Sequence, residues 1–148
     1  MLAKIMNGEL LLALIVYSSF NQDGIAFFTP DSFSQQLGYM KRPPGYQIPP
    51  HVHNPVTRAV LFTQEVLFIR RGKVRVDFYG EDKGYLESRI LNGGDVILLA
   101  AGGHGFEMLE ESEIIEVKQG PFTGDADKTR FAHVSPKEVR IVTEDFSQ

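Results

Sequence analysis

Residues 65–79 read EVLFIRRGKVRVDFY, and this stretch decides the fold class. Apolar and polar side chains alternate along residues 73–79, which is the two-residue period of a half-buried strand. Residues 65–69 are apolar on both faces apart from Glu65. With Gly72 in the turn, the stretch predicts a β-hairpin whose first strand needs cover on its outer side. The N-terminal strands or a second subunit are the two candidates for that cover.

Short apolar segments separated by glycine and proline recur along the chain, which holds 14 Gly and 8 Pro. That rhythm predicts an all-β sandwich or barrel. Asn7-Gly8 is a strong hairpin dipeptide between residues 3–6 and 9–17. A helix capped by Asn7 is the competing prediction. The other predicted strands cover residues 25–28, 36–40, 87–91, 96–100, 104–108, 114–118 and 139–143.

The length of 148 residues fits one domain, with N-terminal strands over 3–28, a barrel core over 36–119 and a C-terminal extension over 120–148. The absence of cysteine excludes a disulfide scaffold and a cysteine nucleophile. A net charge of −4 argues against nonspecific nucleic-acid binding. The longest apolar run, Leu10–Tyr17, is shorter than the roughly 20 residues of a membrane span. We therefore expect a soluble, cytoplasmic protein that binds neither nucleic acid nor membrane.

Four side chains of metal-binding type stand out: His51, His53, Glu65 and His104. His51 and His53 flank one residue, so on a strand both imidazoles point to the same face. Glu65 has the parity of Leu67, and a carboxylate at such a buried position favours a nearby cation. His104 follows a glycine pair at the start of a later strand. Three imidazoles and one carboxylate suit a divalent transition metal such as Fe, Mn, Ni or Zn.

The order and spacing of these residues resemble the two sequence motifs of the cupin family. The residues similar to the first motif are Gly45, His51-Val52-His53, Glu65 and Gly72. Those similar to the second motif are Gly94-Asp95, Ala100-Ala101, Gly102-Gly103 and His104. The resemblance covers residues 45–108 by motif and reaches Lys118 by strand rhythm. It implies a jelly-roll barrel, also called a double-stranded β-helix, in which one metal is bound by His51, His53, Glu65 and His104.

The chain departs from the family pattern in three ways that bear on the candidate site. Ala100-Ala101 replaces the family's proline with one residue fewer before His104, Met108 replaces the closing Asn, and the segment between His53 and Glu65 is longer. Eleven residues, 54–64, separate His53 from Glu65, which is more than the family has. We interpret the excess as a longer hairpin loop, because a longer loop costs little extra closure entropy. Such a loop would overhang the site and bring Arg58 to a bound anion. Tyr39 is the second candidate for substrate contact.

Glu116 and Lys118 share one face of the predicted strand 114–118. If that face points inward, both are candidate catalytic acid–base groups; a solvated edge is the alternative. The resemblance implies isomerase, epimerase or dioxygenase chemistry, and its likeness to small cupins encoded among sugar and surface-polysaccharide genes favours a sugar or sugar-nucleotide substrate. A barrel that binds a sugar or small acid without turnover is the second hypothesis, and a structural cupin without metal is the third. Apolar faces on both sides of residues 65–69 predict a homodimer.

Overall fold

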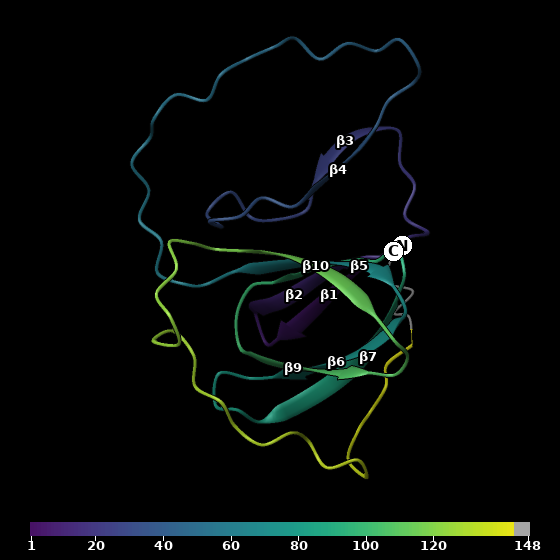
Figure 1. Cartoon of the computed structure of the whole chain (residues 1–148), viewed down its shortest axis with the longest axis vertical. Coiled ribbons are helices and arrows are strands. Elements are labelled where there is room, and N and C mark those ends of the chain that lie inside the picture. The colour runs from purple at the N-terminus through teal and green to yellow at the C-terminus, as the bar shows by residue number, and fades with distance from the viewer. Residues whose placement is uncertain (144–148) are drawn as a thin grey trace.

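The computed structural model describes residues 1–143, which form ten β-strands and no helix (Figure 1). The all-β prediction is therefore confirmed. No helix in this range is long and apolar enough to cross a membrane. The strands are β1 (Leu2–Asn7), β2 (Leu10–Val16), β3 (Gly24–Phe27), β4 (Gly38–Lys41), β5 (Glu65–Arg71), β6 (Lys73–Tyr79), β7 (Tyr85–Asn92), β8 (Val96–Leu99), β9 (Gly103–Met108) and β10 (Glu113–Lys118).

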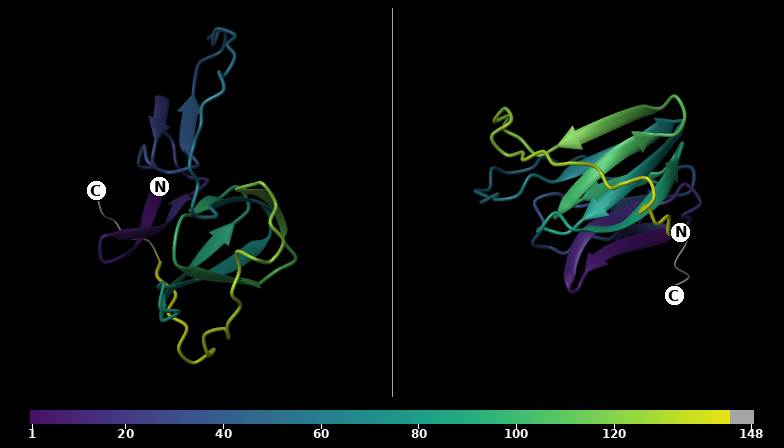
Figure 2. Two further views of the ribbon diagram at one scale, coloured as in Figure 1. Left: turned by 90° about the vertical axis from the view of Figure 1, so that its left-hand side faces the viewer. Right: turned by 90° about the horizontal axis from the view of Figure 1, so that it is seen from below.

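Two antiparallel sheets face each other and enclose the core (Figures 1 and 2). The larger sheet has the order β1-β2-β8-β5-β10, and the smaller has the order β7-β6-β9. Neither sheet closes on itself within the described residues, so the chain forms a sandwich with open edges rather than a closed barrel. β9 and β10 are edge strands, one in each sheet.

The core is built from alternate positions of the facing strands. On β5, Leu67 and Ile69 are buried, whereas Phe68 between them is 38% exposed on the outer face. Glu65 is also buried, as its parity predicted. The buried apolar cluster draws on both sheets: Ala3, Ile5, Leu12, Ala13, Ile15, Leu67, Ile69, Val74, Val76, Phe78, Leu91, Ile97 and Leu99.

The predicted hairpin over residues 65–80 is wrong, because β5 and β6 belong to different sheets. β5 pairs with β8 and β10, whereas β6 pairs with β7 and β9. Gly72 turns the chain from one sheet to the other with a φ of 94°, and a Cβ at this position would collide with Ser112 and Glu111. Alternation fixes which face of a strand is buried but does not identify the neighbouring strand.

The hairpin predicted at Asn7-Gly8 is confirmed, and the competing helix is not formed. β1 pairs with β2, and β2 pairs with β8, so the N-terminal strands extend the larger sheet at its side. They do not cover the outer face of β5, where Phe68 is exposed together with Ile115 and Val117 of the neighbouring β10. The N-terminal strands are therefore not the cover for this face, and cover by a second subunit stays a prediction.

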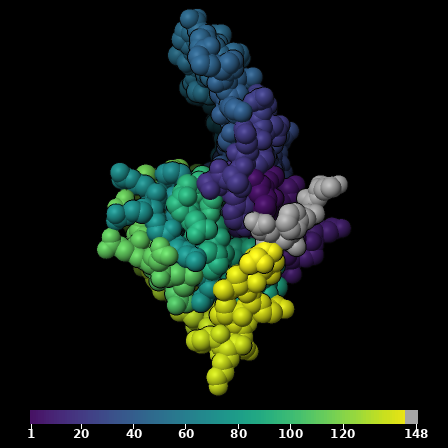
Figure 3. Space-filling view, turned by 90° about the vertical axis from the view of Figure 1, so that its right-hand side faces the viewer, coloured from purple at the N-terminus to yellow at the C-terminus, as the bar shows by residue number. Residues whose placement is uncertain are grey.

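Residues 42–64, here called the arm, leave the sandwich between β4 and β5 (Figures 1 and 3). The paired strands β3 and β4 form its base. The other end is fixed where the Thr63 hydroxyl donates to Asp127 at 2.7 Å and the Gln119 N–H donates to the Gln64 carbonyl at 2.9 Å. The arm contains five of the eight prolines and no strand. Proline fixes φ and lacks an N–H, which favours a stiff, extended segment.

Residues 131–142 run along the outer face of the smaller sheet. The strand predicted over 139–143 is wrong, because only an isolated bridge forms there, between Ile141 and Ser88 of β7. The last residues of the predicted C-terminal extension, 144–148, lie outside the described residues.

Candidate functional site

Glu65, His104 and Lys118 meet at one end of the sandwich. Glu65 begins β5, and Lys118 lies opposite it in the register of β10. His104 enters from β9, across the gap between the two sheets. Its Nε2 lies 3.1 Å from Glu65 Oε2, and Lys118 Nζ lies 3.6 Å from Glu65 Oε1. Three strands from two sheets therefore deliver one carboxylate, one imidazole and one ammonium group to the same place.

The Glu65 carboxylate is buried, whereas its two partners remain partly open to solvent. Its side chain is 10% exposed, against 30% for His104 and 26% for Lys118. The hydrogen bond from His104 holds the pKa of Glu65 below its ordinary value, against the opposing effect of burial, and the positive charge of Lys118 adds to the lowering. The cluster therefore keeps an ionised carboxylate beneath two groups that a bound molecule can reach.

The hydrogen bond also fixes the form of the imidazole. A neutral histidine carries a proton on one ring nitrogen only. When Nε2 donates to the Glu65 carboxylate, Nδ1 is left as the nitrogen that can accept a proton. Glu65 thus orients His104 in the manner of the acid in a catalytic triad.

His51 and His53 do not reach this cluster within one chain. Both lie exposed on the arm, with their rings 5.1 Å apart in an edge-on contact, and His51 Nδ1 lies 3.1 Å from the Pro49 carbonyl. The four residues of the predicted metal site are thus divided into two pairs. Within residues 1–143, no three or more histidine or acidic side chains are grouped to hold a metal ion.

Neither pair forms a metal site by itself. The 3.1 Å contact between His104 Nε2 and Glu65 Oε2 is the hydrogen bond described above, and the rings of His51 and His53 lie in edge-on contact. Two donors fall short of the three or four protein ligands that a transition metal takes. The residues brought together in one chain therefore do not fit the metal that the cupin resemblance implies.

The other predicted site residues are spread over the fold. Lys118 lies in the cluster, whereas Glu116, two residues earlier on the same strand, is exposed. Tyr39 on β4 packs edge-on against Phe20, with 4.9 Å between ring centroids. Arg58 lies on the arm, with its guanidinium 3.4 Å from the Val56 carbonyl. Neither Tyr39 nor Arg58 shares a hydrogen bond or ion pair with Glu65 or His104 in the described part of the chain.

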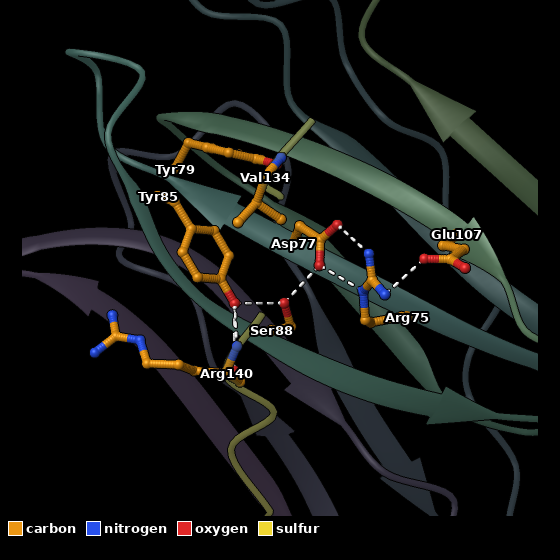
Figure 4. Close-up of polar contacts among 8 residues, drawn as sticks. All are labelled: Arg75, Asp77, Tyr79, Tyr85, Ser88, Glu107, Val134 and Arg140. Carbon is orange, nitrogen blue, oxygen red and sulfur yellow. Dashed lines mark hydrogen bonds and ion pairs between the residues drawn. The ribbon is translucent and has the colours of Figure 1, made fainter. Parts of the chain in front are cut away.

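A second polar cluster on the outer face of the smaller sheet was not foreseen from the sequence (Figure 4). The buried Asp77 carboxylate accepts hydrogen bonds from Arg75 at 2.8 and 3.0 Å and from the Ser88 hydroxyl at 2.5 Å. Ser88 in turn lies 2.8 Å from the Tyr85 hydroxyl, which accepts the Arg140 N–H at 2.8 Å. The alternation of β6 predicted a polar outer face, but the segment that buries this face has no periodicity to reveal it.

This outer cluster fastens the C-terminal segment to the sheet. The Tyr79 hydroxyl accepts the Val134 N–H at 3.0 Å, and Arg140 also donates to the Leu86 carbonyl. Glu107 lies on this outer face, 2.6 Å from Arg75, opposite in parity to His104. The contacts connect the sheet to residues 131–143 and satisfy one another, which is the pattern of a structural network.

Comparisons of the chain with protein-family models, with curated proteins and with solved structures gave no match.

Proposed function

We propose that the protein is a cupin-type small-molecule enzyme that moves a proton next to a carbonyl group, with a sugar or sugar-nucleotide derivative as its substrate class. The observation that carries this proposal is the buried Glu65 carboxylate, which lies 3.1 Å from His104 and 3.6 Å from Lys118. The sugar class rests on the motif resemblance alone. Isomerase or epimerase chemistry is favoured because all three groups of the cluster serve proton transfer and charge stabilisation.

The proposed step begins with a ketone bound beside His104 and Lys118. The C–H bond next to the carbonyl breaks, and His104 Nδ1 takes the proton. The electron pair of that bond forms a carbon–carbon double bond, and the carbonyl oxygen receives the negative charge. The Lys118 ammonium group stabilises that oxygen, while Glu65 stabilises the imidazolium. Return of the proton to the opposite face of the same carbon gives the epimer. Where that carbon carries a hydroxyl group, return of the proton to the former carbonyl carbon, with transfer of the hydroxyl proton to the former carbonyl oxygen, gives the isomer.

Deuterium exchange from solvent tests this step directly. The full chain is incubated in D₂O with dTDP- and UDP-linked 4-keto-6-deoxyhexoses, and mass spectrometry follows deuterium at the carbons beside the carbonyl. We expect enzyme-dependent incorporation, reduced about 10²-fold or more in His104→Gln and in Lys118→Met. His133→Gln is the matched control because His133 is exposed and outside the cluster.

Two outcomes would overturn the proposal. Incorporation that is unchanged in His104→Gln would remove the cluster from the reaction. Tight binding of either sugar nucleotide with no deuterium gain would leave a binding protein, which is the alternative from the other functional class.

A further inference from the structure

The arm and the open edge of β9 are complementary features of the same chain. The arm exposes a run of apolar side chains: Tyr46, Ile48, Val52, Val56, Val60, Leu61 and Phe62 are between 40% and 90% exposed. An extended segment with this much apolar surface in water is the usual mark of an interaction surface. Both ends of the arm are fixed and its prolines stiffen it, so it is held away from its own sandwich.

The receiving surface is the unpaired edge of β9, with β10 at the edge of the opposite sheet. These are edge strands of opposite sheets, and within residues 1–143 the edge of β9 that faces away from β6 has no backbone partner. An unpaired edge is a template for an added strand from another chain. His104 lies on β9, and Lys118 lies on β10, so an added strand would lie directly beside the Glu65 cluster.

The charges of the two surfaces are opposite. The arm carries two arginines and no acidic residue, in a chain whose net charge is −4. Residues 103–118, from β9 through β10, carry five glutamates and one lysine. A segment with the composition of the arm is therefore attracted to this edge, whereas a second acidic edge would be repelled.

We infer that each arm is received by a second copy of this chain along the free edge of β9, and that His51 and His53 of one copy meet Glu65 and His104 of the other. Alternation along an added strand places both imidazoles on one face and Val52 on the opposite face. Opposite positions of paired strands have Cβ atoms about 4.5–5.5 Å apart, which brings the arm histidines to His104. The partner's arm thereby adds two imidazoles to the Glu65 cluster of the proposed function, so that the candidate site is complete only when two chains exchange their arms.

Disulfide trapping tests the exchange without reference to metal or activity. The chain has no cysteine, so each introduced thiol is unique. Val52→Cys is mixed with Gly105→Cys, since residue 105 has the outward parity expected of Val52 and a Cβ there makes only ordinary contacts, 3.6–3.8 Å from His133 and Tyr79. Under diamide, we expect a disulfide between differently tagged chains. Lys4→Cys, exposed on β1, replaces Gly105→Cys as the control and should give none.

The same trapping distinguishes exchange from an arm that folds back. If the arm reaches its own β9, the mixed single variants form no heterodimer, and the double variant Val52→Cys/Gly105→Cys closes within one chain. That pair of results would overturn the inference. A monomer at micromolar concentration by light scattering would also overturn it.

Complementation tests the shared site. One chain carries His51→Ala/His53→Ala, and the other carries Glu65→Gln/His104→Gln; the two are co-expressed, and the heterodimer is isolated through two different tags. The deuterium-exchange assay should find no enzyme-dependent incorporation with either parent and about half of the wild-type rate with the heterodimer, because one of the two symmetric sites is intact. A heterodimer as inactive as its parents, beside an active wild type, would place the site within one chain.

Failure here is separable from failure of the proposed function. Deuterium exchange without trapping would leave the enzyme and remove the exchanged arm. Trapping without deuterium exchange would leave the exchanged arm and remove the reaction.

Discussion

Asp77 is a buried carboxylate whose hydrogen-bond donors are themselves hydrogen-bonded to other residues. Its side chain has no exposed surface, and both of its oxygens accept hydrogen bonds. The donor order runs from the Arg140 N–H to the Tyr85 hydroxyl, then to the Ser88 hydroxyl and finally to the Asp77 carboxylate (Figure 4). Each hydroxyl both donates and accepts, so the chain of bonds has a single direction.

Removal of this carboxylate should destabilise the fold strongly. Asp77→Ala leaves Arg75 and the Ser88 hydroxyl without their main acceptor, and loss of one partner of a buried ion pair costs about 3–5 kcal/mol. Urea denaturation measures the loss in the free energy of unfolding. Glu111→Ala, which removes the exposed ion pair with Arg71, should change it by less than about 1 kcal/mol. Equal effects would contradict the structural role of Asp77.

Ionisation of Tyr79 should destabilise the folded state at alkaline pH. Burial raises the pKa of its phenol above the ordinary value of 10.0, although the Val134 N–H that it accepts opposes the rise. The folded state therefore holds this proton more tightly than the unfolded state does. The resulting stability is complete below pH 10 and is lost as the pH rises through the folded pKa.

The free energy of unfolding should accordingly fall more steeply above pH 10 in the wild type than in Tyr79→Phe, which has no phenolic proton. Chemical denaturation at a series of pH values between neutral and alkaline measures both slopes. Parallel slopes would show that Tyr79 titrates alike in both states.

At the scale of the strand and its turns, Gly72 marks the change of sheet. Its φ of 94° is disfavoured for other residues, and a Cβ there would also collide with Ser112 and Glu111. Gly8 has a φ of 62° but nothing within 4 Å of a Cβ. A side chain at position 8 would therefore cause backbone strain only, whereas one at position 72 would cause both backbone strain and a steric clash.

Gly8→Ala should lower the free energy of unfolding by about 1–2 kcal/mol, which is the cost of the left-handed conformation alone. Gly72→Ala should lower it by more, because the chain must also move away from the β9–β10 connection. Thermal or urea unfolding of the two variants provides the comparison. A smaller loss in Gly72→Ala than in Gly8→Ala would mean that the turn at Gly72 rearranges at little cost to remove the clash.

Sequence periodicity located most of the strands but did not determine how they pair. The burial of Glu65, the outward direction of Glu107 and the hairpin at Gly8 all follow from parity and turn chemistry, which are local properties. The neighbours of β5 depend on contacts far along the chain, so the 65–80 hairpin was predicted wrongly. The same limit applies to the candidate site, where the sequence identified Glu65 and His104 but not the separation of His51 and His53.

The cause of that separation is visible in the composition of the arm. The motif spacing predicts that His51 and His53 meet Glu65 and His104, but this requires the arm to fold back over its own sandwich. Five prolines between Arg42 and Gln64 remove backbone donors and favour an extended path. The eleven residues interpreted as a loop are part of this extended segment instead.

At the scale of the whole molecule, the arm contributes no residue to the buried apolar cluster of its own sandwich. A chain in which residues 44–61 are replaced by a Gly-Ser sequence of equal length should melt within about 5 °C of the wild type. Calorimetry measures the midpoint, and light scattering of the same sample should show a monomer. A collapse of the melting transition would show that the arm supports its own sandwich.

The arm extends away from its own sandwich, and each sandwich has an unpaired edge at β9. These two features together have a consequence for assembly at high protein concentration. If two molecules exchange segments reciprocally, every edge is filled and growth stops at two. If the segment instead enters a third molecule, the same contact repeats without end and builds a filament. The angle at which the segment departs, set by β4 and Gln64, therefore decides between a discrete particle and a fibre.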